Sequence, residues 1–97
     1  MNSKQRAYLK GLASNLEPIV HVGKASASPE VVASAEEALN ARELIKIGVL
    51  KNCADDPRTI AEIIAERTHS QVVHVIGKKI VLYKPNKDKP VIKLPVD

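Results

Sequence analysis

The chain has 97 residues, a formal net charge of +4 and 44% hydrophobic residues. This length suits one folded domain, residues 1–97, and is too short for a catalytic domain plus a regulatory one. No window approaches the roughly 18 consecutive apolar residues of a membrane span, and the N-terminal residues lack the apolar run of a secretion signal. We therefore expect a soluble cytoplasmic protein with no membrane partner. The single cysteine, Cys53, excludes an internal disulfide.

Positive charge is concentrated in two segments of the chain. Residues 1–24 and residues 78–84 each carry a net charge of +3, whereas residues 25–77 carry −3. If folding brings the two basic segments together, a polyanion is the natural partner for that surface. The alternative is an ordinary solvated face.

The first predicted element is a helix over residues 3–15. Ser3 is a suitable N-terminal cap, and Tyr8, Leu9 and Leu12 lie at helical spacing, which places Tyr8 in the core. Pro18 ends this helix. The apolar tetrapeptide IVHV that follows predicts a short buried strand.

Two further helices begin with the same signal. In Ser28-Pro29 and in Asp56-Pro57, the first residue caps free backbone amides and the proline has no amide to satisfy. The stretch ELIKIGVL between these helices predicts a second strand. QVVHVIGKKIVLYK then predicts a hairpin that turns at Gly77-Lys78. Residues 85–97 contain three prolines, and we expect them to run extended along the surface.

The order helix, strand, helix, strand, helix, strand, strand predicts an α+β domain. We expect a two-layer α/β sandwich with a mixed four-stranded sheet and the element order αβαβαββ. Right-handed crossovers place the second and third helices on the same face of the sheet. The first crossover puts Gly23-Lys24 at the carboxyl end of a strand and the amino end of a helix, where free amides and the helix dipole favour an anion.

The sequence disfavours a nucleotide-hydrolysing P-loop at this Gly-Lys pair. Such a loop needs a glycine five positions before the pair and a serine or threonine directly after it to hold magnesium. Here those positions are Pro18 and Ala25. The loop is also too short to wrap a triphosphate.

No other set of residues predicts catalysis or metal binding. The chain holds three histidines: His21, His69 and His74. They lack metal-ligand spacing, so core or surface roles are favoured. Cys53 has no evident base nearby in the sequence, and Asp55 and Asp56 fit turn and capping roles. We therefore predict no enzyme activity, no cofactor and no metal.

Two long stretches carry a family resemblance. The run YLKGLASNLEPIVHVGKASASPEVVASAEEALNARELIKIGVL, together with VVHVIGKKIVLYK and the proline-broken tail, resembles the CRM domain. This is the RNA-binding module of chloroplast splicing factors and of the small bacterial YhbY proteins. The resemblance covers essentially the whole chain. It implies a fold similar to the C-terminal domain of bacterial translation initiation factor three, and binding of structured RNA. For stand-alone bacterial members it implies association with maturing large ribosomal subunits.

The family's signature is a Gly-x-x-Gly loop, and it falls on Gly23-Lys24-Ala25-Ser26. Ser26 replaces the second glycine. The glycines of such a loop let the backbone approach phosphates closely. Ser26 therefore puts tight backbone contact in question, although its hydroxyl can donate to a phosphate in partial compensation.

We predict a monomeric, non-catalytic RNA-binding protein that binds ribosomal RNA in the precursor of the large subunit. The alternative is a protein-interaction module that associates with ribosomal proteins without direct RNA contact. The only aromatic residues are Tyr8 and Tyr83, so the chain lacks a stacking platform for single-stranded bases, and contacts to the RNA backbone are favoured.

The predicted RNA-binding residues share one surface in this interpretation. They are Gly23, Lys24, Ala25, Ser26, Arg6, Lys10, Lys78, Lys79 and Lys84. Arg42 and Lys46 are weaker candidates, because arginines in loops and lysines in strands are often only solvated. The acidic residues of the second and third helices are expected to face away from the RNA.

Overall fold

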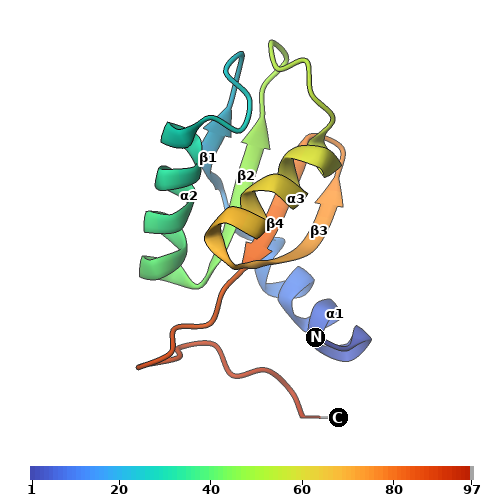
Figure 1. The fold of residues 1–97 in the computed structure, drawn as a ribbon. Coiled ribbons are helices and arrows are strands. Elements are labelled where there is room, and N and C mark those ends of the chain that lie inside the picture. Colours follow the sequence, from blue (N-terminus) through green and yellow to red (C-terminus); the bar gives the residue numbers. More distant parts are fainter. Residues whose placement is uncertain (97) are drawn as a thin grey trace.

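A computed structural model describes residues 1–96, which form three helices and a four-stranded sheet (Figure 1). In chain order the elements are α1 (Ser3–Ala13), β1 (Pro18–Val22), α2 (Pro29–Arg42), β2 (Leu44–Val49), α3 (Pro57–Thr68), β3 (Gln71–Ile76) and β4 (Lys79–Tyr83). The predicted α+β class and element order are confirmed. Among these described residues, no helix is both long and apolar enough to cross a membrane.

The strands lie in the order β1-β2-β4-β3. β1 pairs with β2 in parallel, whereas β2 with β4 and β3 with β4 are antiparallel. The sheet is therefore mixed, as predicted. Because β1 and β2 are parallel, the turns that follow these two strands lie at the same end of the sheet.

The predicted caps of α2 and α3 are confirmed. The hydroxyl of Ser28 accepts from the backbone N–H of Val31 at 3.2 Å. The carboxylate of Asp56 accepts from the N–H groups of Arg58 and Thr59 at 3.1 and 3.2 Å. In both helices a proline occupies the first turn, where its missing N–H has no cost.

The predicted cap of α1 is wrong by one residue. Asn2 caps the helix in place of Ser3, with its side chain accepting from the N–H of Gln5 at 2.8 Å. The Gln5 side chain in turn accepts from the N–H of Asn2 at 3.1 Å. Because this reciprocal pair satisfies two backbone donors at once, it fixes the start of the helix at Asn2.

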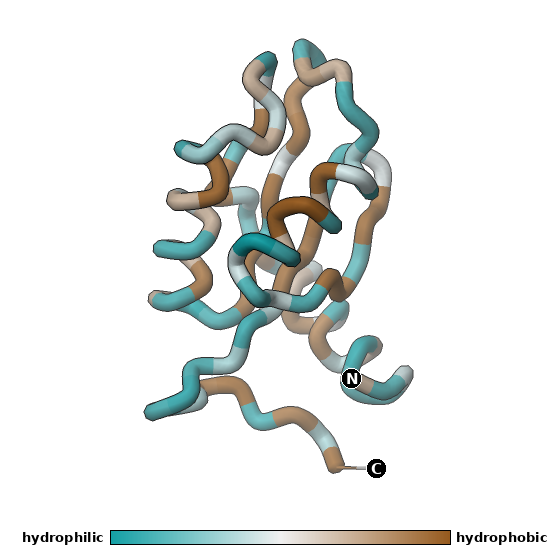
Figure 2. Tube along the Cα trace, viewed as in Figure 1, coloured by the Kyte–Doolittle hydropathy of each residue, from teal (hydrophilic) through white to brown (hydrophobic). Residues whose placement is uncertain are grey.

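α2 and α3 lie together on one face of the sheet, here called the front face (Figure 1). Leu39 of α2 and Ile60 and Ile64 of α3 are buried against Ile47 and Leu82 of the central strands. Figure 2 shows hydrophobic residues along these strands and hydrophilic ones at many of the turns. This placement of both crossover helices on one face is the predicted one.

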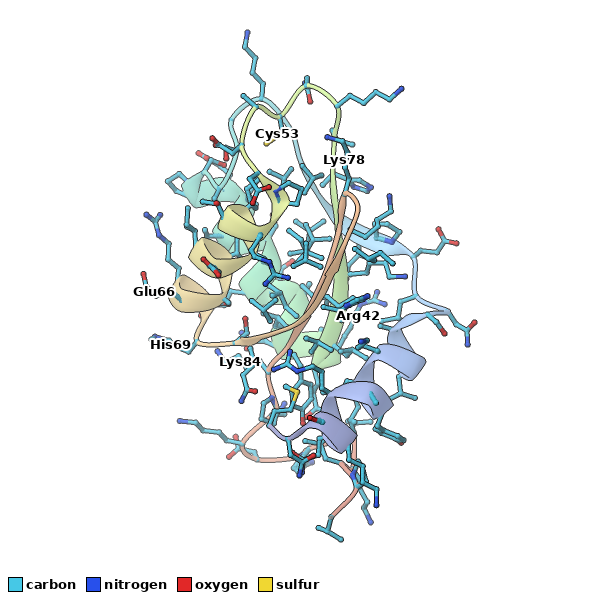
Figure 3. All side chains as sticks on the ribbon, turned by 90° about the vertical axis from the view of Figure 1, so that its right-hand side faces the viewer. Arg42, Cys53, Glu66, His69, Lys78 and Lys84 are labelled. Atoms are coloured by element: carbon cyan, nitrogen blue, oxygen red, sulfur yellow. The ribbon has the colours of Figure 1, made fainter. Side chains whose placement is uncertain are left out.

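α1 packs on the opposite face of the sheet, here called the back face. Leu9 and Ala13 are buried there against Val73 and Tyr83. Figure 3 shows the sheet with α1 on one side and α2 and α3 on the other. Tyr8 is 42% exposed, so its predicted place in the core is wrong: the helix turns Leu9 and Ala13 to the sheet instead. The short α1 leaves part of the back face uncovered.

The tail, residues 85–96, continues from β4 without forming a helix or strand, and Asp97 lies outside the described residues. The tail is fastened by Glu43, which is only 2% exposed. Its carboxylate accepts from the backbone N–H groups of Asn86, Val91 and Ile92 at 2.6, 2.9 and 2.8 Å. Burial by itself raises the pKa of Glu43, but the three N–H donors outweigh it and hold that pKa below its ordinary value.

Candidate nucleic-acid interface

The loop between β1 and α2 makes a tight turn at the predicted site. The N–H of Ser26 donates to the carbonyl of Gly23 at 3.0 Å. Ser26 has a φ of 56°, in the left-handed region that favours glycine. The serine therefore adopts the kind of backbone conformation for which glycine is suited, and some steric strain remains at this position.

Several backbone donors of this loop are available to a ligand. Within residues 1–96, the N–H groups of Lys24, Ala25 and Ala27 donate to no backbone carbonyl. They precede the amino end of α2, where the helix dipole also favours negative charge. The loop can therefore present N–H donors and one lysine side chain to an anion.

Two other turns lie at the same end of the sheet. A Cβ added to Gly23 would lie 3.3 Å from Oδ1 of Asn52, so the turn after β2 rests against the loop. The N–H of Val49 donates to the carbonyl of Lys78 at 2.8 Å, which brings in the turn of the β3–β4 hairpin. We call these three turns the loop edge. They comprise residues 23–26, 51–52 and 77–78.

The loop edge carries three exposed lysines, Lys24, Lys51 and Lys78. The sequence predicts Lys24 and Lys78 as RNA contacts but not Lys51. The parallel pairing of β1 with β2 is the signal that finds Lys51, because it places the turn after β2 beside the Gly23 loop.

The part of the back face beside α1 is crossed by two rows of paired residues, most of them exposed or half-buried, although Gly48 and Val81 are buried. The row nearer the loop edge consists of His21, Gly48, Lys79 and Ile76. The next row consists of Pro18, Lys46, Val81 and His74. Neither row contains a carboxylate. Basic side chains therefore continue from the loop edge across this face.

His74 lies in a positive electrostatic environment. Its pKa lies below the ordinary value, first because the ring is partly buried and then because the positive charges of Lys10 and Arg58 disfavour a second cation. The neutral imidazole is thus favoured at pH 7. The same positive field favours an anion beside the ring.

Arg6 has a role inside the fold. Its Nη1 donates to the carbonyls of Val72 and Val73 at 2.8 and 2.9 Å. The register of β3 shifts between Val72 and His74, so Arg6 holds the strand at an irregularity where ladder pairing is disturbed. A contact between Arg6 and RNA stays a prediction.

Lys84 lies far from the loop edge. It follows the last residue of β4, whereas Lys79 begins that strand, and strand geometry separates the two by roughly 16 Å. Figure 3 shows Lys78 and Lys84 at opposite ends of the hairpin. The structure thus brings Lys24, Lys78 and Lys79 to one end of the sheet, with Lys10 on the adjoining face, and it leaves Lys84 apart from them.

The acidic residues of α2 and α3 lie on the helices that cover the front face. Those selected from the sequence are Glu30, Glu36, Glu37, Glu62 and Glu66. All but Glu36 are exposed. No group of three or more His, Cys, Asp or Glu side chains within residues 1–96 is placed to hold a metal ion.

The fold and this surface define a small αβαβαββ domain with a lysine-bearing loop edge. Residues 1–84 match the family model of the CRS1 / YhbY (CRM) domain, and the chain belongs to this family. It is 42% identical to "Probable RNA-binding protein YqeI" of Bacillus subtilis over 95 residues, which is 98% of this chain and 99% of that protein.

Two further comparisons cover nearly the whole chain. A protein of Haemophilus influenzae named "RNA-binding protein" is 37% identical over 95 residues, 98% of this chain and 95% of that protein. The solution structure of the hypothetical protein SAV1595 from Staphylococcus aureus superposes with a TM-score of 0.83 at 40% identity, covering 98% of this chain and 99% of that one. The fold is therefore shared with a solved relative.

Proposed function

We propose that this protein binds structured RNA without catalysing a reaction, and that it does so through the loop edge and the uncovered part of the back face. The observation that carries the proposal is the gathering of Lys24, Lys51 and Lys78 around loop amides at the amino end of α2. Lysine side chains and backbone N–H groups are donors that hold phosphates. The names of two relatives, which specify RNA, support this choice of polyanion.

We infer further that the RNA is ribosomal and that the protein acts on the precursor of the large subunit. In this proposal the protein acts as a cytoplasmic monomer. Residues 1–97 form one RNA-binding domain, and the domain needs no cofactor. The support is the resemblance to stand-alone bacterial CRM proteins.

The direct test is binding to protein-free large-subunit ribosomal RNA, measured by filter binding or gel shift. Lys24→Glu reverses a charge beside the loop amides and is expected to weaken binding by tenfold or more, since it also opposes the helix dipole. Lys87→Glu makes the same change in the exposed tail and is the matched control. Circular dichroism checks that both variants fold. Equal affinities for the parent and a folded Lys24→Glu variant would contradict the role of the loop edge.

The same experiment separates the alternative function. An interaction module for a ribosomal protein is favoured by exposed apolar side chains such as Ile76, which is 61% exposed, and Ile19, which is 40% exposed. Such a module would bind large subunits but not protein-free RNA. Hydrolysis of ATP or GTP by the pure protein, abolished by changing Lys24, would instead contradict the non-catalytic proposal.

A further inference from the structure

A cavity of about 260 Å³ opens on the back face beside the C-terminal half of α1. Its walls are largely apolar and include Val81, which is 3% exposed, and Ile76, which is 61% exposed. The polar side chains around it include Lys10, Lys46 and His74. The cavity is smaller than those that hold drug-sized ligands. It is therefore suited to a small flat group carried by a larger molecule.

We propose that this cavity accepts a single unpaired base of the bound RNA, with the flanking phosphates held by Lys10 and Lys46. The inference rests on the proposed function, because it concerns the same back face. The base would lie against the aliphatic side chains of Val81 and Ile76. It would need no aromatic partner, since burial of its faces against apolar groups already removes them from water.

The arrangement of the sheet supports this occupant. In the strand register Lys46 pairs with Val81, and Val81 pairs with His74. An ammonium group, an apolar surface and an imidazole thus follow one another across three adjacent strands. A neutral imidazole offers one N–H donor and one acceptor to the edge of a base, while the lysine is a donor to phosphate.

The charge around the cavity argues for a nucleotide rather than an apolar peptide side chain. Lys10 and Lys46 both line it, and the positive charge of Lys10 contributes to the lowered pKa of His74 after burial of the ring. An apolar side chain would fill the space but leave both ammonium groups without an anion. A nucleotide supplies the flat group and the negative charge together.

The test compares three RNA hairpins that share one stem. The first carries a single bulged adenosine, the second an abasic nucleotide at the bulge, and the third is fully paired. The parent protein is expected to bind the bulged RNA roughly five- to thirty-fold more tightly than the abasic one, because only the bulged RNA has a base whose apolar surface can be removed from water. Ile76→Ala is expected to reduce this preference. Ile19→Ala, which shortens another exposed isoleucine outside the cavity, is expected to leave it unchanged.

Two further measurements locate the base and the phosphates. Lys46→Gln is expected to weaken binding of the bulged RNA more than the matched tail variant Lys87→Gln does. In NMR spectra, the imidazole signals of His74 are expected to shift with the bulged RNA and to shift less with the abasic one.

The outcomes distinguish this inference from the proposed function. If the parent binds the bulged and abasic RNAs equally, or Ile76→Ala weakens both to the same extent, the base site is refuted while RNA binding stands. An unchanged His74 spectrum with the bulged RNA refutes it as well. If the parent binds none of the hairpins and no protein-free ribosomal RNA, the proposed function fails and the base site fails with it.

Discussion

The carboxylate of Glu43 accepts a hydrogen bond of 2.8 Å from the backbone N–H of Ile92, 49 positions further along the chain. The same carboxylate holds Asn86 and Val91, and Ile92 and Leu94 pack against the core beneath α1. One buried side chain thus joins the start of β2 to the tail. The tail is therefore part of the fold although it has no regular secondary structure.

We predict that Glu43→Gln loosens the tail and destabilises the protein. The glutamine keeps one acceptor oxygen but puts an amide nitrogen, which is a donor, where a backbone N–H now donates. The expected loss in the free energy of unfolding is about 1–3 kcal/mol, the scale for a buried hydrogen bond to a charged group. Urea denaturation measures it, and limited proteolysis reports faster cleavage after residue 85.

Glu37→Gln is the matched control for this prediction, because Glu37 is an exposed residue of α2. It is expected to change the free energy of unfolding by less than about 0.5 kcal/mol. If both variants behave like the parent in stability and proteolysis, Glu43 does not hold the tail.

A second prediction concerns pH. The pKa of Glu43 in the folded protein lies below its ordinary value of 4.5, so the folded state binds this proton less readily than the unfolded chain. The resulting stability is fully present above about pH 4.5 and is lost as the pH falls through the lowered folded pKa. Urea midpoints at pH 6 and pH 3 are expected to differ more for the parent than for Glu43→Gln. Equal differences would show that another group controls the acid response.

Local patterns explain why most of the fold could be predicted. The Ser28 and Asp56 caps are encoded within a few residues of the helices they begin, and so is the hairpin turn at Gly77. The buried face of α1 was harder to predict. Tyr8 and Leu12 are four residues apart, and so are Leu9 and Ala13. Either could form the buried stripe. The structure buries the second pair against the sheet.

The candidate site was only partly predictable for a different reason. Lys24 follows a strand and precedes a capped helix, which is visible in the sequence. Lys51 joins it only through the parallel pairing of two strands, and the link between Glu43 and the tail spans more than forty residues. Contacts of that range leave no local pattern.

A third prediction concerns the strained serine of the loop. Ser26 has a φ of 56°, which disfavours a residue with a Cβ by about 1 kcal/mol or more. Ser26→Gly removes this strain but adds flexibility to the unfolded chain. We therefore expect unchanged or slightly increased stability, and equal or tighter RNA binding. Ala25→Gly adds flexibility without relieving a positive φ and should be less stable than Ser26→Gly by about 1 kcal/mol in urea denaturation.

A fourth prediction concerns the contact between the first two turns of the loop edge. Gly23→Ala would place a Cβ 3.3 Å from Oδ1 of Asn52 and 3.7 Å from Cδ1 of Leu50. One of the turns must shift by a few tenths of an ångström, so RNA binding is expected to weaken while the protein stays folded. Asn52→Ala removes the closest atom and should restore much of the affinity in the double variant. A double variant no better than Gly23→Ala would show that the crowding lies elsewhere.

The last prediction is that RNA binding depends strongly on salt through the lysines of the loop edge. If the complex neutralises about four to six phosphates, counterion release gives a slope of log affinity against log salt concentration on the order of −3 to −5. Substituting Gln for Lys24, Lys51 or Lys78 should in each case reduce the magnitude of the slope by roughly 0.7–0.9, because each change removes one neutralised phosphate.

The control for this prediction is Lys84→Gln. Lys84 follows the other end of β4, so this variant decides how far the interface extends. An unchanged slope for Lys84→Gln confines the phosphate contacts to the loop edge and the adjoining back face, whereas a reduction equal to that of Lys24→Gln extends the RNA along the whole hairpin. A parent affinity that does not change between 50 and 200 mM salt would be incompatible with phosphate binding at any of these lysines.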